Sequence, residues 1–314
     1  MLGIEIKHFR SDIENDKQGS SMKINRVLTT VLTAVSIAVL GMAISSEILA
    51  KEAVSLRGEY VQGGLIIGQA ADVKEVKKVM FDSRQLKLSE EGDFAFGFGR
   101  DAAAAHELVI VLEDGSRIVK KLEITKREYR IQKIEGISKK VMNPSKSNLE
   151  RIRAENASVK KARQTDDART DFMQDFKWPL LGEITGVYGS QRVFNGVPKR
   201  PHYGVDVAAP VGTQIVSPAD GVVTLYHPNM FYSGGTLIVD HGHGISSTFI
   251  HLKRGLVKVG QHVKQGEIIA ETGASGRATG PHLDWRMNWF NVRLDPVLVV
   301  GTMPSAGKQK RPLN

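Results

Sequence analysis

Short apolar segments separated by turn-forming residues dominate the second half of the chain and most constrain its fold. From Phe176 onward, pieces such as Val222-Val223 and Leu237-Ile238-Val239 alternate with Gly, Pro, Asn and Asp. Runs of β-branched residues bounded by such turn formers are typical of strands, and no long helical periodicity interrupts them. We therefore expect an antiparallel β-sheet domain over residues 178–300.

A second set of strand signals lies over residues 51–137. Segments such as Asp93–Gly99 and Glu107–Leu112 carry alternating or continuous apolar residues, and Asp114-Gly115 is typical of a hairpin turn. Several short strands in a segment of this length predict a small β-sandwich. Because no motif with recognisable chemistry lies here, we interpret it as an accessory domain that positions or binds.

The segment between these two regions, residues 138–177, is rich in charged and small polar residues. Leu149, Ile152 and Val159 form a thin apolar stripe between Asn148 and Arg163, which predicts a partly helical linker. A solvated linker helix is one interpretation of this pattern. A regulatory arm that folds over the functional site is the other.

Residues 1–50 have the layout of a leader. Met22 begins a short basic segment, an uncharged run of 18 residues follows from Val27 to Ile44, and small residues come next. This order is typical of a secretory signal, and it predicts that translation begins at Met22. An uncleaved membrane anchor is the alternative, because 18 residues are the lower limit for a span. Residues 301–314 form a basic tail.

Charge and cysteine content exclude several kinds of site. The net charge of +9 suits an acidic partner, but no nucleic-acid recognition signature accompanies it, so we predict no nucleic-acid partner. The chain has no cysteine, which excludes a Cys nucleophile, a Cys-based zinc finger and a disulfide framework. A transition metal would have to be bound by His, Asp, Glu or Asn.

Three segments of the expected sheet carry histidine and aspartate in metal-type spacing. His202 and Asp206 form H-x-x-x-D at the entry to a strand, and His282 and Asp284 lie two apart, on one side of a strand. His251 lies in an apolar strand between them. Neutral imidazoles and carboxylates are ligands for Zn²⁺, so the sequence predicts a metal-hydrolase site.

The region from about Trp178 to Val300 resembles the lysostaphin-type (LytM-like) zinc metalloendopeptidases, which cut peptide cross-bridges in peptidoglycan. The resemblance rests on H-Y-G-V-D-V-A-A-P from His202, P-A-D-G-V-V from Pro218, D-H-G-H-G from Asp240, H-L from His251, V-G-Q-H-V-K-Q-G from Val259 and T-G-A-S-G-R-A-T-G-P-H-L-D from Thr272. Ala219–Val223 and Val259–Ile269 also resemble the biotinyl/lipoyl-type hybrid β-fold.

The resemblance implies a role for each of the five residues. His202 and Asp206 would be zinc ligands, and His251 and His282 would flank the water that attacks. The family has a histidine as its third ligand, where this chain has Asp284. Aspartate can bind zinc at about the same distance as histidine, but two carboxylates and one imidazole cancel the charge of the metal, which weakens its Lewis acidity.

Two functions follow from the resemblance. The first is a zinc-dependent endopeptidase, with one Zn²⁺, that hydrolyses peptidoglycan in the periplasm or cell envelope. It would touch a membrane only through an uncleaved leader, and other cell-wall enzymes or envelope proteins are expected partners. The alternative is a degenerate domain that binds peptidoglycan or activates another hydrolase.

His241 and His243 form a second H-x-H, interpreted as a polar hairpin turn or else as a substitute ligand.

Overall fold

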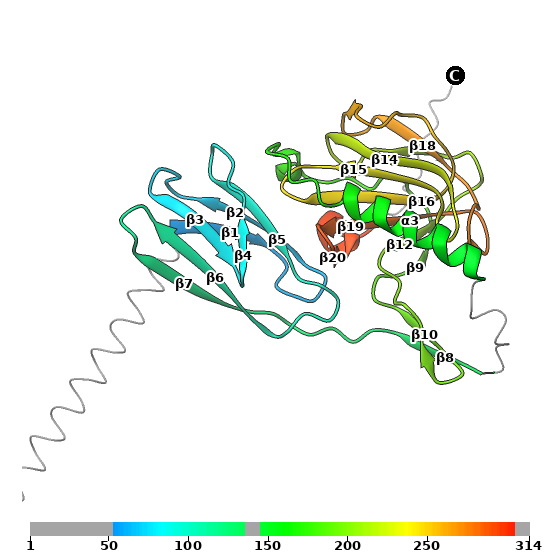
Figure 1. Cartoon of the computed structure of the whole chain (residues 1–314), viewed down its shortest axis with the longest axis horizontal. Helices are drawn as coiled ribbons and strands as arrows, with labels where there is room; N and C mark the ends of the chain where they lie inside the picture. Colours follow the sequence, from blue (N-terminus) through cyan, green and yellow to red (C-terminus); the bar gives the residue numbers. More distant parts are fainter. Residues whose placement is uncertain (1–52, 136–144, 305–314) are drawn as a thin grey trace, which may run out of the picture. The chain divides into compact units, whose positions relative to one another are not determined.

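The computed structural model describes residues 53–135 and 145–304 of the 314-residue chain (Figure 1). The predicted leader and most of the basic tail lie outside the described residues. Strands make up most of the regular structure, as the sequence predicts. Within the described ranges, no helix is both long enough and apolar enough to cross a membrane.

The first seven strands form two antiparallel sheets, of order β1-β2-β5 and β4-β3-β6-β7. Their bounds are β1 Val54–Gly58, β2 Leu65–Ala70, β3 Val76–Phe81, β4 Arg84–Leu86, β5 Asp93–Gly97, β6 Ala105–Leu112 and β7 Arg117–Glu123. Phe94, Phe96 and Phe98 are almost completely buried, and Phe81 stacks on Phe96 with 4.4 Å between ring centroids. The predicted small β-sandwich is therefore present.

Two elements join this sandwich to the rest of the chain. Strand β8 (Ile131–Ile134) pairs in parallel with β10 (Gln191–Phe194), which also pairs with β11 (Val197–Pro198). Helix α3 (Lys146–Ala162) begins after Ser145, whose hydroxyl accepts from the backbone N–H of Asn148, and it has lysines in its last turn. These are favourable caps for a helix with an otherwise thin apolar stripe.

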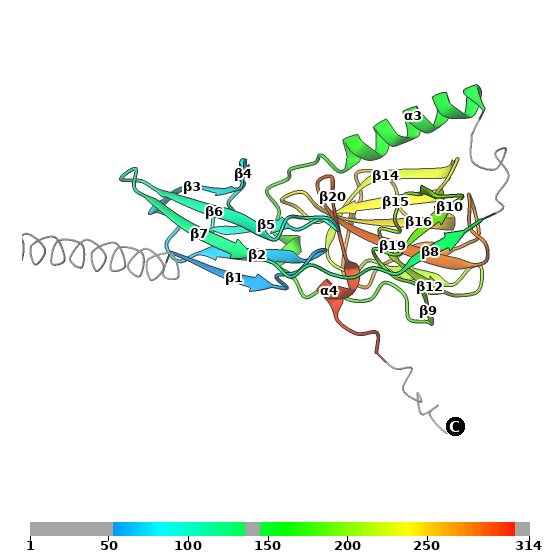
Figure 2. The same ribbon diagram turned by 90° about the horizontal axis from the view of Figure 1, so that it is seen from below.

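Helix α3 is docked rather than solvated on all sides. It runs along the β14 side of the large sheet (Figure 2), and the Glu155 carboxylate accepts from the backbone N–H of Phe231 at 2.8 Å. Ser233, two residues further on, accepts from the backbone N–H of His251. The helix therefore fixes the loop at Phe231 and Ser233, which in turn hydrogen-bonds to the predicted site residue His251. A regulatory role for this helix stays a prediction.

The second half of the described chain forms one large sheet of order β17-β14-β15-β16-β19-β12-β9, extended by β13, β18 and β20. The bounds are β9 Ile184–Gly186, β12 Val205–Ala208, β13 Gln214–Val216, β14 Gly221–Met230, β15 Gly234–Asp240, β16 Ile245–Gly255, β17 His262–Val263, β18 Ile268–Thr272, β19 His282–Trp289 and β20 Val292–Leu294, followed by α4 Pro296–Val300. All the pairings within this sheet are antiparallel, as predicted.

Strand β19 is the two-faced strand that the sequence pattern indicates. Leu283, Trp285 and Met287 alternate on one side and are completely buried, and Trp285 meets Trp178 edge-on. The intervening positions, which include His282 and Asp284, lie on the other side. Burial of the apolar side fixes the register, because a slip of one residue would turn the polar groups into the core.

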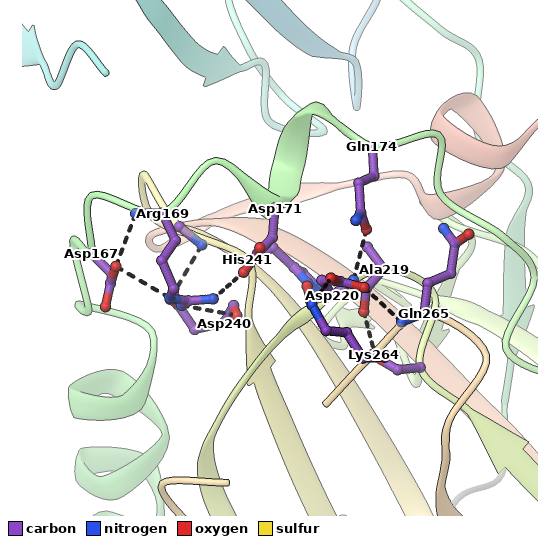
Figure 3. A network of polar contacts seen from close by, with 12 residues as sticks. Asp167, Arg169, Asp171, Gln174, Ala219, Asp220, Asp240, His241, Lys264 and Gln265 are labelled. Carbon is purple, nitrogen blue, oxygen red and sulfur yellow. Dashed lines mark hydrogen bonds and ion pairs between the residues drawn. The ribbon is translucent and has the colours of Figure 1, made fainter. Parts of the chain in front are cut away.

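The D-H-G-H-G turn joins β15 to β16, but it is buried. The chain after α3 covers it: Phe172 donates its backbone N–H to the His241 carbonyl, and Arg169 forms an ion pair with Asp240 (Figure 3). The His241 ring donates from Nδ1 to the Asp220 carbonyl at 2.6 Å and accepts at Nε2 from Ser247 at 3.0 Å. Both ring nitrogens of His241 therefore already have hydrogen-bond partners within the protein.

Burial of this turn predicts a pH-dependent loss of stability that depends on His241. Burial lowers the pKa of His241 to about 4, so the unfolded chain takes up the proton first as the pH falls. The neutral His241 side chain contributes its full stabilisation above the ordinary pKa of about 6.5. About 3 kcal/mol of this stabilisation is lost as the pH falls towards 4. Chemical denaturation at pH 7.5 and 4.5 measures this loss.

Comparison with His241→Gln isolates the contribution of His241 to this loss of stability. Burial raises the pKa of Asp240 to about 7, and this group stabilises the fold towards lower pH, against the effect of His241. The wild type should therefore lose more stability than His241→Gln between the two pH values. An equal loss in both proteins would contradict the assignment.

Candidate metal centre

The sheet brings together three of the predicted site residues, His202, Asp206 and Asp284. One ligand-type atom of each lies within 4.8 Å of the others. Strands β12 and β19 are paired so that Asp206 and Asp284 are directly opposite each other. His202 precedes β12 and is fixed by two backbone hydrogen bonds, from its own N–H to Ser190 and to its carbonyl from Gly189.

The donor atoms of this cluster fit a metal ion. His202 Nε2 lies 3.3 Å from Asp206 Oδ1, and both atoms are buried without a hydrogen-bond partner. Ligand atoms around a tetrahedral zinc ion at about 2.0–2.1 Å lie roughly 3.3–3.4 Å apart. Buried polar atoms normally have partners, so two orphaned atoms at this separation could hold a metal ion between them.

Asp284 is the deepest member of the cluster, with 3% of its side chain exposed against 18% for His202 and 23% for Asp206. Arg286 donates to it twice, from Nε to Oδ1 at 2.9 Å and from Nη2 to Oδ2 at 2.5 Å. Burial alone would raise the pKa of Asp284, but the charge and hydrogen bonds of Arg286 outweigh it and bring the pKa to about 2. The group is therefore a carboxylate at neutral pH.

Asp206 has the opposite shift. Burial, and then the negative charge of Asp284 across the strand pair, raise its pKa, while His202 and His282 act in the other direction. Two carboxylates held face to face in a partly buried site repel each other. A cation bound between them would relieve this repulsion, which makes the cluster suited to hold a metal.

His251 reaches the site through an irregular backbone. Its φ is +64°, a left-handed conformation that costs a non-glycine residue about 1–3 kcal/mol. At this point β16 stops pairing with β19, whose Asp284 lies opposite Ile250, and begins to pair with β18 at Leu252. The ring donates from Nδ1 to the Ser275 carbonyl at 2.8 Å, which leaves the Nε2 lone pair available.

His282 lies beside His251, with 4.8 Å between the ring centroids. Its Nδ1 donates to the Gly280 carbonyl at 2.8 Å, and its Nε2 lies 3.8 Å from Asp206 Oδ1. A carbonyl oxygen can only accept, so each ring carries a proton on Nδ1, and a neutral ring in this position has its lone pair on Nε2. The two rings therefore present a pair of proton acceptors next to the cluster.

His241 and His243 are not part of this arrangement. Asp240, which precedes His241, pairs with Ser246, whereas the metal-type cluster lies opposite Ile250 further along β16. Among the described residues, the one group of His, Asp and Glu that could hold a metal is His202, Asp206 and Asp284. The interpretation of His241 or His243 as a substitute ligand finds no support in this geometry.

Two features of the site were not foreseen from the sequence. Arg286 lies two residues after Asp284 on the same side of β19, and this spacing was the signal that could have identified it. Gly204 lies against the pair: a Cβ there would meet Asp284 Oδ1 at 2.4 Å and Arg286 Cγ at 2.6 Å. Glycine is therefore required for the close approach of strand β12 to this ion pair.

Comparison with known proteins agrees with this geometry. Residues 200–296 match the model of peptidase family M23. The peptidoglycan DD-endopeptidase ShyA of Vibrio cholerae is 38% identical over 117 residues, which are 36% of this chain and 25% of that protein. ShyC of the same organism is 43% identical over 97 residues, 31% of this chain and 22% of that protein. The chain thus spans about a quarter of the length of these curated relatives.

A solved structure of an M23 peptidase from Pseudomonas aeruginosa is similar over a longer range. It is 26% identical, with a TM-score of 0.60, and the match covers 77% of this chain and 96% of that one. The C-terminal part of the chain is thus similar to peptidase M23 proteins in both sequence and fold.

Proposed function

We propose that this chain is a zinc-dependent endopeptidase that hydrolyses peptide cross-bridges or stems of peptidoglycan in the bacterial cell envelope. The observation that carries the proposal is the pair of orphaned, buried ligand atoms of His202 and Asp206, next to two histidines with available Nε2 lone pairs. The names of the curated relatives support the substrate class, and they support a location in the periplasm or envelope.

His202, Asp206 and Asp284 would hold the metal. A bound zinc ion supplies Lewis-acid polarisation of the scissile carbonyl and makes hydroxide available near neutral pH. A neutral His251 or His282 ring has its lone pair on Nε2, so one of them can take the proton of the attacking water and pass that proton on to the leaving amine. Backbone carbonyl groups accept from Nδ1 of both rings and so fix the orientation of each ring.

Product analysis tests the proposed function. Purified protein is incubated with peptidoglycan and zinc, and the soluble products are examined for new amino groups and for cross-links lost. We expect both, with loss of the reaction when the metal is chelated. No product from the wild-type protein at any zinc concentration would contradict the proposal.

One observation favours the alternative of a non-catalytic domain. Both oxygens of Asp284 already accept from Arg286, as they would if the ion pair had replaced the metal. A domain of this kind would bind peptidoglycan or activate another hydrolase without zinc. Co-sedimentation of the zinc-free protein with peptidoglycan, without new amino groups when zinc is added, would favour this alternative.

A further inference from the structure

Arg286 is a charged residue of the site that neither the sequence motifs nor the metal-type cluster accounts for. It shares one side of β19 with Asp284, and its two donors meet the two carboxylate oxygens in a fork at 2.9 and 2.5 Å. Bidentate pairs of this kind fix the plane of a carboxylate as well as attract it. The carboxylate is almost fully buried, so water cannot replace the arginine as its partner.

Charge balance also favours a cation at this place. Asp206 and Asp284 face each other across β12 and β19, and His202 adds no charge when it binds a metal. Two carboxylates cancel the charge of a divalent metal and leave it a weak Lewis acid. One guanidinium in contact with Asp284 returns the sum to +1.

The packing around the pair indicates that it is built into the fold. Gly204 provides the space that the pair occupies, since any side chain there would collide with both partners. Thr248, opposite Arg286 on β16, accepts from the buried Arg163 at 2.9 Å. Arg163 is thus a second buried cation near Asp284, and its charge also acts on that carboxylate.

We propose that Arg286 is a positioning residue of the metal centre. It fixes the orientation of the Asp284 carboxylate and offsets its charge, so that His202, Asp206 and Asp284 together bind zinc. The inference deepens the proposed function and rests on it for the identity of the metal. Arg286 acts through Asp284 and does not touch the reacting atoms.

A double-mutant cycle on zinc affinity tests this role without any assay of turnover. Four versions of the chain compete for zinc with a coloured chelator: the wild type, Arg286→Leu, Asp284→His and the double variant. Arg286→Leu should weaken zinc binding by about 10–100-fold, as is usual when a partner of a metal ligand is lost. In the Asp284→His background the sign should reverse, because the arginine then lacks a carboxylate and repels the metal.

Two further variants separate charge and geometry from general damage. Arg286→Lys keeps the charge but not the fork, so its zinc affinity should lie between those of the wild type and Arg286→Leu. Arg293→Leu removes a neighbouring guanidinium that donates to Asn288 rather than to a carboxylate, and it should leave zinc affinity within about threefold of the wild type.

Three outcomes would overturn the inference. Tighter zinc binding by Arg286→Leu would show that the arginine competes with the metal for Asp284. An equal effect of Arg286→Leu in the wild-type and Asp284→His backgrounds would show that the two positions are not coupled. Absence of zinc binding by the wild type would remove the centre itself. If the cycle gives the expected reversal but peptidoglycan is not cleaved, only the proposed function fails.

Discussion

Replacement of His251 by Asn is expected to lower kcat on peptidoglycan cross-links by about 10²–10⁴-fold, because a positioned general base is removed. Zinc content should be unchanged, since the metal-type cluster lies on other residues. Asn is preferable to Ala because it tolerates the left-handed backbone of this position, where φ is +64°. The comparison of kcat with zinc stoichiometry in the same sample gives the result.

The pH profile provides a second measurement on the same residue. Burial lowers the pKa of His251, so the imidazole stays neutral, with its Nε2 lone pair free, at pH values below the ordinary pKa of histidine. The acid limb of kcat should therefore lie below about pH 6.5. His262→Asn, at an exposed position in β17, is the matched control and should keep both the rate and the profile. Full activity of His251→Asn would contradict its role as a base.

Loss of a ligand should have an equally large effect through a different route. His202→Ala removes one of the two orphaned donor atoms, and we expect zinc to bind at least about 100-fold more weakly, beyond what loss of an outer partner causes. Turnover should fall to the background rate at limiting zinc. Metal analysis after dialysis, with His262→Ala as control, measures the loss.

The same analysis on Asp284→Ala tests the unusual ligand. Zinc content should fall as it does for His202→Ala, and the freed Arg286 should repel the metal further. Unchanged zinc in either variant would show that the residue replaced is not a ligand. Circular dichroism of each variant, compared with the wild type, separates loss of a ligand from loss of the fold.

Sequence reasoning predicted the parts of the site that depend on local pattern. The alternation around Leu283 placed His282 and Asp284 on one side of a strand, and the structure has them there. Spacing within a strand is dictated by the two-residue repeat of the backbone, so it can be read from the chain directly. The mainly β fold was predictable for the same reason.

The rest depends on contacts between distant residues. Nothing local indicates that Asp206 lies opposite Asp284, that β8 pairs with β10, or that the chain after α3 buries the turn at His241. These follow from strand order and from the closure of long loops, which no local pattern specifies. The two-residue spacing of Asp284 and Arg286 could have indicated an ion pair from the sequence, but only the structure shows that this pair is buried and bidentate.

The proposed function requires that a metal held by His202, Asp206 and Asp284 supports hydrolysis of peptidoglycan cross-links. Titration of zinc into the metal-free protein, with release of new amino groups followed at each addition, tests it most directly. We predict that the rate rises in proportion to zinc and reaches a plateau at about one equivalent per chain, as expected for a single site. A rate that stays at the background level through several equivalents would contradict it.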